Sequence, residues 1–217
     1  CFVWAIRVTG KPPAIPGGNG PQGLSLSSLP LTHLWFLYVL VLLYCAALLL
    51  RLVVSAADPD GKFRERVVDR AMRLLLQSPL AAPILAIPLA AAFASTTRWR
   101  SWLGIEPPAF GLIPNSAAIV GFGTAFAVGW LLHRQTSLFS ALQRWWHVQL
   151  ALATALTIFC LWTIGTRPSL DYTPWTDQLI GYAIAYAVAV WAWTLGLTGA
   201  ALRFLDAERP AVRYLAD

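Results

Sequence analysis

The sequence has few charged residues and few cysteines. Only 12% of its 217 residues are Asp, Glu, Lys or Arg, about half of the roughly 25% usual in soluble globular domains. The three cysteines do not indicate a disulfide framework, because Cys1 is terminal whereas Cys45 and Cys160 lie within apolar runs. With 58% hydrophobic residues, the composition is typical of an integral membrane protein.

Sequence motifs for binding phosphate or metal are also missing. The GGNG run at 17–20 follows no strand and opens no helix, so it is a loop rather than a phosphate cradle. His133 and His147 have no carboxylate or thiol nearby in the sequence, and we expect neither a metal site nor a bound cofactor. The net charge of +6 is explained by basic membrane loops, so we expect no nucleic-acid partner.

Apolar runs of helical length recur along the chain and predict an all-α, multi-spanning membrane bundle. A helix of about 20 apolar residues crosses a hydrocarbon core of about 30 Å. Residues 1–217 are interpreted as one membrane domain, part of a longer protein, with a Gly/Pro/Ser-rich outer loop at 9–32. The five expected spans are 33–53, 79–95, 114–132, 148–166 and 179–202.

The expected span at 79–95 is the weakest, because it is short and contains Pro83 and Pro88. If it crosses the membrane, the 16 Lys and Arg residues divide eleven to five between the two sides; otherwise they divide nine to seven. Cytoplasmic loops carry an excess of Lys and Arg, so the five-span arrangement is favoured. It places residue 33 on the outer side and the C-terminal tail in the cytoplasm.

One stripe of the first expected span carries the groups on that helix that titrate readily. At about 100° per residue, Tyr44 returns to within about 20° of His33, and Arg51 falls on the same line. Such groups are costly against lipid, so the stripe is a candidate wall of a site. The more common alternative is that His33 and Arg51 mark the two interfaces and Trp35 is an interfacial aromatic.

A basic amphipathic stretch follows the turn at residues 58–61. Its apolar residues suit a helix that lies on the membrane surface. The arginines considered for a site are Arg64, Arg66, Arg70 and Arg73. They indicate either a loop that faces anionic lipid or a binding surface for a phosphate-bearing donor, because guanidinium groups match phosphate geometry.

Two side-chain patterns mark the later spans. Tyr182, Tyr186 and Trp193 share one face of the last span, either as a packing stripe, which is the default, or as a wall for sugar stacking. A small-residue face that suits close helix packing comprises Gly121, Ala125 and Gly129.

Three stretches, in this order and spacing, resemble acyltransferase family 3, a family of multi-spanning membrane enzymes. They are HLWFLYVLVLLY at 33–44, FAVGWLLHRQ at 126–135 and RFLDAERPAVRYLAD at 203–217. The resemblance covers about residues 31–217 and is closest to the glucans biosynthesis protein C branch. The O-antigen branch has a Ser and a pair of Glu where this chain has Phe36, Leu40 and Val41, although Tyr44 matches.

The resemblance implies an enzyme that transfers acyl groups other than amino-acyl groups. The donor would be a cytoplasmic acyl-CoA carrying acetyl or succinyl, and the acceptor a hydroxyl of a periplasmic or extracellular carbohydrate. In the family the catalytic histidine lies on an opening helix, which we expect upstream of this fragment, so the fragment alone would be inactive. His33 and Tyr44 are then candidate oxyanion donors, with Trp35 and the four arginines as candidate substrate-binding residues.

The implied location is a bacterial inner membrane, with the bilayer itself as a partner. The competing interpretation is a non-catalytic membrane scaffold or a small-molecule transporter. Transporters usually show inverted repeats and paired broken helices. The sequence contains no evident repeat, and only the proline-rich segment looks broken, so acyl transfer is favoured.

Overall fold

The computed structural model describes residues 34–96, 99–106, 114–169, 171–173 and 176–205. Within this part of the chain, the regular structure is helical, and the one β-type contact is an isolated bridge between Trp99 and Thr173. The six α-helices are α2 (Trp35–Ala57), α3 (Arg70–Gln77), α4 (Ala81–Ala94), α5 (Ser116–Arg134), α6 (Phe139–Ile164) and α7 (Asp177–Phe204). The predicted all-α, multi-spanning bundle is confirmed.

Within the described residues, four segments are long and apolar enough to cross a membrane. They are α2, α5, α7 and the helical segment Thr136–Ile164, which contains α6. The segments Arg64–Gln77 and Ala81–Ala94 meet at a bend of 112° and would make a fifth crossing if they are counted as one broken span. The bend at Ser78–Leu80 separates the basic surface stretch from the proline-containing helix α4.

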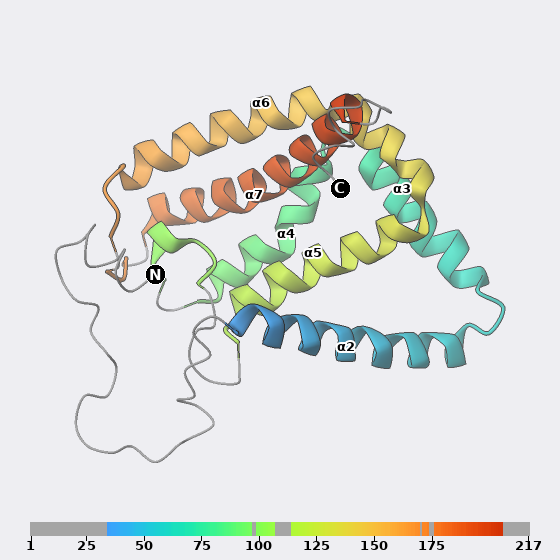
Figure 1. Ribbon diagram of the computed structural model, residues 1–217. Helices are drawn as coiled ribbons and strands as arrows, with labels where there is room; N and C mark the ends of the chain where they lie inside the picture. Colours follow the sequence, from blue (N-terminus) through green and yellow to red (C-terminus); the bar gives the residue numbers. More distant parts are fainter. Residues whose placement is uncertain (1–33, 97–98, 107–113, 170, 174–175, 206–217) are drawn as a thin grey trace, which may run out of the picture.

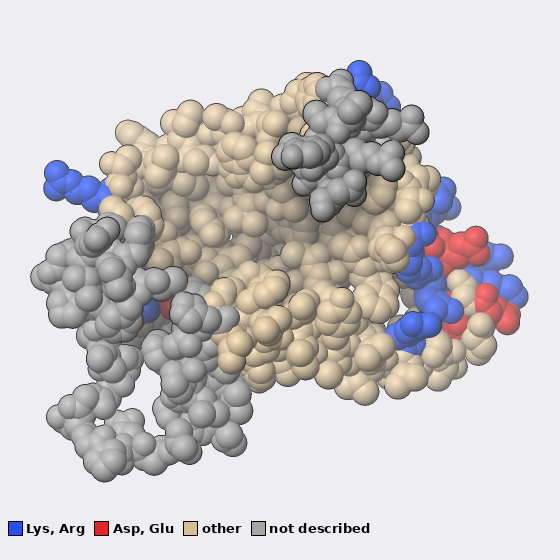
Figure 2. All heavy atoms as spheres, viewed as in Figure 1, with Lys and Arg blue, Asp and Glu red and all other residues tan. Residues whose placement is uncertain are grey.

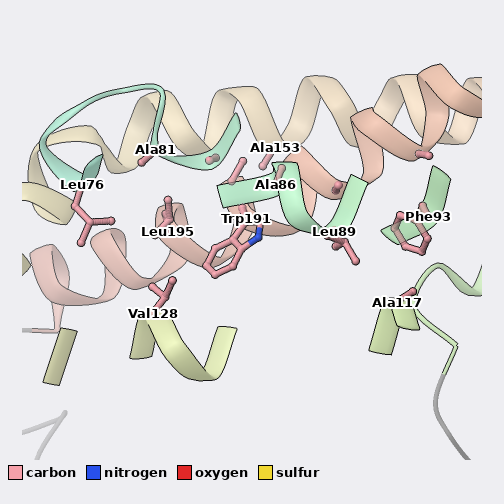
Figure 3. Packing of buried hydrophobic residues seen from close by; sticks show 14 of the residues in the cluster. Leu76, Ala81, Ala86, Leu89, Phe93, Ala117, Val128, Ala153, Trp191 and Leu195 are labelled. Carbon is pink, nitrogen blue, oxygen red and sulfur yellow. The ribbon is translucent and has the colours of Figure 1, made fainter. Parts of the chain in front are cut away.

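Helix α4 lies at the centre of the described bundle. It packs against α5 and α7, and its side chains Ala82, Leu89 and Phe93 are at most 1% exposed. Figure 3 shows Trp191 of α7 between Ala86 of α4 and Val128 of α5. Pro88 lies inside α4 without ending it, which is possible where neighbouring helices surround a freed backbone group.

Helix α4 runs from the side of the bundle where α3 lies toward the start of α5 (Figure 1). Near its start, the Gln149 side chain of α6 donates to the Pro79 carbonyl at 3.0 Å. Beyond its end, the Thr173 amide donates to the Trp99 carbonyl at 2.9 Å. With 14 residues, α4 is about 21 Å long, so a fifth crossing also needs the preceding segment Arg64–Gln77. The membrane topology itself stays a prediction.

The start of α6 differs from the expected one. The helix begins at Phe139 rather than near residue 148, so the stretch expected as a loop is helical. Leu142 is buried and the Trp145 indole donates to the Gln77 carbonyl at 2.9 Å. These contacts with α3 and the rest of the bundle stabilise a helical turn that is too polar to be recognised as part of an apolar run.

Close helix packing involves other glycines than those expected. A methyl group on Gly196 or Gly199 of α7 would collide with Leu150 or Leu142 of α6. In the expected small-residue face, only Gly121 makes a comparably close contact, since Gly129 has nothing within 4 Å of such a methyl group and Ala125 is exposed. Small residues therefore bring α6 and α7 together, as is common where helices meet inside membranes.

Candidate functional site

We call the end of the bundle formed by residues 99–106, 165–169 and 171–173 the aromatic end. Its loops are held by three hydrogen bonds that involve Trp99 or Ser101. Besides the bond from Thr173 to the Trp99 carbonyl, the Ser101 and Thr173 hydroxyls lie 2.6 Å apart, and the Tyr182 hydroxyl donates to the Ser101 carbonyl at 2.8 Å. Both loops are thus tied to each other and to α7.

A cluster of aromatic rings forms the base of this end. Phe93 stacks on Trp99 with ring centroids 4.3 Å apart, and Trp99 lies 5.3 Å from Tyr182. The Trp99 indole donates to the Gly104 carbonyl at 2.7 Å. Gly104 has a φ of +65°, and a side chain there would collide with Tyr186, so only glycine fits this turn.

A polar cavity of about 250 Å³ lies above the aromatic base, between α6 and α7. Most of its polar groups are hydroxyls, and its carboxylate is Asp171, whose Oδ2 accepts a hydrogen bond from the Ser169 hydroxyl at 3.2 Å. Trp102 contributes an indole and Gln178 an amide. Indole, amide, hydroxyl and carboxylate groups together suit a neutral molecule with many hydroxyls.

A second cavity of about 300 Å³ adjoins the first one and is lined mainly by apolar and aromatic groups. Trp102 and Ile164 line both cavities. Farther along the helices, the Trp193 indole of α7 donates to the Thr157 hydroxyl of α6 at 2.9 Å. The second cavity therefore lies between α6 and α7, with a hydrogen bond between the helices at the end away from the loops.

We call the opposite end the basic end, where α3 meets the C-terminus of α5 and the N-terminus of α6. Most of the charged groups visible in Figure 2 gather there. Asp69 joins the helices, because it pairs with Arg134 at 3.5 Å and accepts a hydrogen bond from the Gln135 amide at 3.1 Å. The two ends thus differ in chemistry, one rich in arginine and the other in hydroxyls and aromatic rings.

The four arginines of the basic stretch are not equivalent. Arg64 pairs with Asp58 at 3.5 Å and its backbone N–H donates to the same carboxylate at 3.0 Å. That backbone hydrogen bond, the largest cause, lowers the pKa of Asp58, with the Arg64 charge acting in the same direction. Arg64 therefore holds the start of the helix and is a weaker candidate for binding substrate.

Arg66, Arg70 and Arg73 are exposed, and no ion pair joins any of them to another described residue. The π-helical turn Arg64–Asp69 carries Arg66, and α3 carries the other two. Phe63 and Val67, on the same segment, are 60% and 49% exposed. An exposed basic set beside exposed apolar residues is typical of a helix at the membrane surface.

The expected stripe on α2 does not face the bundle. His33 lies outside the described residues. Tyr44 is 49% exposed and touches Phe126 of α5 edge-on, with centroids 5.1 Å apart, while Trp35 lies 5.7 Å from the Phe122 ring. Helix α2 meets α5 along the side that carries Trp35 and Val39, which is its one buried residue, so most of the stripe is left open.

The aromatic stripe on α7 is divided between packing and the second cavity. Tyr182 and Tyr186 are held in the aromatic base, in agreement with the default interpretation, although both also line the second cavity together with Trp193. The sequence interpretation missed the polar cavity, which the loop that carries Trp102 and the loop that carries Asp171 form together. Neither loop indicates by itself that the two meet.

Within the described residues, no three His, Cys, Asp or Glu side chains are grouped as a metal would require.

Fold and composition together define the chain as an α-helical, multi-span membrane protein. Comparisons with protein-family models, with curated proteins and with solved structures find no match for it.

Proposed function

We propose that this chain is the central part of a bacterial inner-membrane acyltransferase. It would move an acetyl or succinyl group from a cytoplasmic acyl-CoA to a hydroxyl of an extracytoplasmic glycan or glucan. The observation that carries the proposal is the contrast between the two ends of the bundle. Helix α6, with 26 residues, separates these ends by about 39 Å, enough to place them on opposite sides of a hydrocarbon core of about 30 Å.

The basic end suits the donor. Three exposed arginines without ion pairs to described residues follow one another at helical spacing, and guanidinium groups bind phosphate oxygens in pairs. An acyl-CoA carries several phosphates, and the excess of basic residues favours the cytoplasm for this end. The support is therefore the match between the charge at this end and that of the donor.

The aromatic end suits the acceptor. The polar cavity offers the hydroxyl, amide and carboxylate groups that bind sugar hydroxyls, together with the indole of Trp102. Among the described residues of its lining, Asp171 is the charged one, and its carboxylate can accept hydrogen bonds from a neutral sugar. In the five-span arrangement this cavity opens on the outer side, where an extracytoplasmic glycan is found.

The chemistry is an exchange of a thioester for an ester. A histidine base takes the proton of the sugar hydroxyl, the new C–O bond forms at the acyl carbon, the C–S bond breaks, and the thiol of coenzyme A leaves with a proton. The carbonyl oxygen becomes negative during the attack and needs a hydrogen-bond donor. We assign the role of hydrogen-bond donor to His33. Tyr44 lies about 16 Å deeper along the helix.

Donor kinetics test the role of the basic end. In the full-length protein, changing Arg66, Arg70 and Arg73 together to Gln should raise the donor KM about tenfold or more, because charge-assisted hydrogen bonds are lost. The effect on kcat should be smaller, since phosphate contacts act on ground-state binding. Lys62→Gln is the control, because Lys62 pairs with Asp60 at the surface. An unchanged donor KM would mean that the basic helix anchors the protein to lipid and does not bind the donor.

Substitution of His33 tests the acceptor side. His33→Ala should lower kcat/KM about 10²-fold or more, and His33→Gln should do less damage if the side chain donates a hydrogen bond rather than transfers a proton. Tyr44→Phe should cause a smaller loss than His33→Ala. Normal turnover with a reduced amount of inserted His33→Ala protein would identify His33 as an interface anchor.

A further inference from the structure

The two cavities at the aromatic end adjoin each other and share two lining residues. Because Trp102 and Ile164 line both cavities, a molecule that spans these two side chains would contact the linings of the polar and the apolar cavity together. Each cavity alone is at or below the lower limit of the usual ligand-binding range of about 300–1,000 Å³, whereas the pair falls within this range. The geometry therefore suits one ligand with two unlike parts.

The apolar part has a defined depth. On α6 its lining extends from Thr157 to Ile164, about 10 Å at 1.5 Å per residue. The hydrogen bond from Trp193 to Thr157 joins the two helices at the deep end. Between these limits the wall contains Leu161 and Val190, side chains that offer no hydrogen bond. The shape and chemistry suit an alkyl chain.

The polar part lies beyond Ile164, where the chain leaves α6 and enters the loop. Gln178 can both donate and accept hydrogen bonds, and Thr176 and Ser169 add hydroxyls. Groups of this kind bind a polyhydroxylated head. Among the described lining residues there is one carboxylate and no basic side chain, which disfavours a phosphate.

We propose that these joined cavities bind an amphipathic molecule, with a sugar head in the polar cavity and an alkyl chain between α6 and α7. The acceptor of the reaction would then be a sugar carried on a lipid rather than a free glucan. The identity of the head as the acceptor rests on the proposed function, whereas the binding of such a molecule does not.

Photolabelling in nanodiscs tests the binding without any turnover. The probe is an alkyl glucoside with a diazirine at the end of its chain, added to the full-length protein, and the labelled residues are mapped by mass spectrometry. Labels should concentrate near Leu161 and Val190, and excess unlabelled alkyl glucoside should remove them, whereas the corresponding alkyl alcohol should not. Asp171→Asn should weaken labelling about tenfold, because a hydrogen bond to a charged group is lost.

Two tryptophans provide a matched pair. Trp102 lines both cavities, whereas Trp162, on α6 between lining residues, is 83% exposed. Trp102→Ala should remove most of the label and Trp162→Ala should leave it unchanged, with Trp102→Phe as a milder variant if the alanine protein does not fold. Val190→Phe, which fills the apolar cavity, should also abolish labelling.

The proposal is overturned if labels spread evenly over lipid-exposed helices such as α2, or if the alkyl alcohol competes as well as the glucoside. Failure of acyl transfer with labelling intact would contradict the proposed function alone. Efficient acylation of a soluble glucan, with no site-specific labelling, would retain acyl transfer and contradict the amphipathic acceptor.

Discussion

A comparison of α2 and α7 shows that the hydropathy of a helix does not predict how much of it is buried in this bundle. Helix α2 is the more hydrophobic of the two, yet only 6% of its most apolar 18-residue segment is buried, whereas 56% of the corresponding segment of α7 is buried. Lipid tails are as apolar as leucine, so a leucine-rich surface gains little by facing another helix. Helix α7 is buried because its small residues allow α6 to approach closely, as Gly196 and Gly199 show.

The largest expected difference is between a buried and an exposed large side chain. Phe93→Ala should lower the free energy of unfolding by about 3 kcal/mol, the lower end of the range for Phe→Ala because the alternative surroundings include lipid. Leu49→Ala in α2, at a side chain that is 64% exposed, should change it by less than about 0.5 kcal/mol. Reversible unfolding of the full-length protein in mixed micelles measures both. Equal losses would refute the contrast between the helices.

The next test concerns the close approach of α6 and α7. Gly199→Leu should destabilise the protein by about 2 kcal/mol, because the new side chain meets the Leu142 backbone and the Trp146 side chain of α6. Gly181→Leu, also on α7, should be neutral or slightly stabilising, since nothing lies within 4 Å of an added methyl group there and leucine favours helix more than glycine does. The same unfolding assay compares them, and a harmless Gly199→Leu would show that the two helices can separate without cost.

A smaller difference is expected for two tyrosine hydroxyls. Tyr182→Phe in α7 should cost about 1 kcal/mol, because it removes the hydrogen bond to the buried Ser101. Tyr44→Phe in α2 should leave the unfolding free energy almost unchanged, since the described contact of Tyr44 is through its ring. A similar cost at both positions would mean that the Tyr44 hydroxyl has a partner of its own.

The smallest effect concerns the turn that follows α2. The Asp58 carboxylate accepts the backbone N–H groups of Phe63 and Arg64, and its pKa is lowered mainly by the Arg64 hydrogen bond. The cap is therefore complete above the ordinary pKa of 3.8 and is lost as the pH falls through the lower value of the folded state. The protection of the Arg64 amide from hydrogen exchange, relative to its intrinsic rate at each pH, should fall in acid, and Asp58→Asn should remove this dependence. An unchanged acid dependence in Asp58→Asn would assign it to another group.

The fold was predictable because its signals are local. Asn115 and Thr176 precede α5 and α7, and both side chains accept hydrogen bonds from the first turn of the helix, as helix caps do. The surface stretch and α4 were expected as separate helices, because one is basic and amphipathic whereas the other is apolar. The polar cavity was not predictable, because Ser101 and Thr173, which lie 2.6 Å apart, are 72 positions apart in the chain.

The amino-acid sequence by itself determined the class of protein, the helical segments and the concentration of arginine in one region. Each of these depends on composition or on residues within a few turns of one another. Only the tertiary structure decided which helices are central and that Trp102 lines two cavities. It also decided that Arg64 pairs with Asp58, whereas Arg66 has no ion pair within the described part of the chain. In a membrane bundle these choices depend on shape and hydrogen bonds between distant segments, because hydrophobicity favours lipid and protein surroundings almost equally.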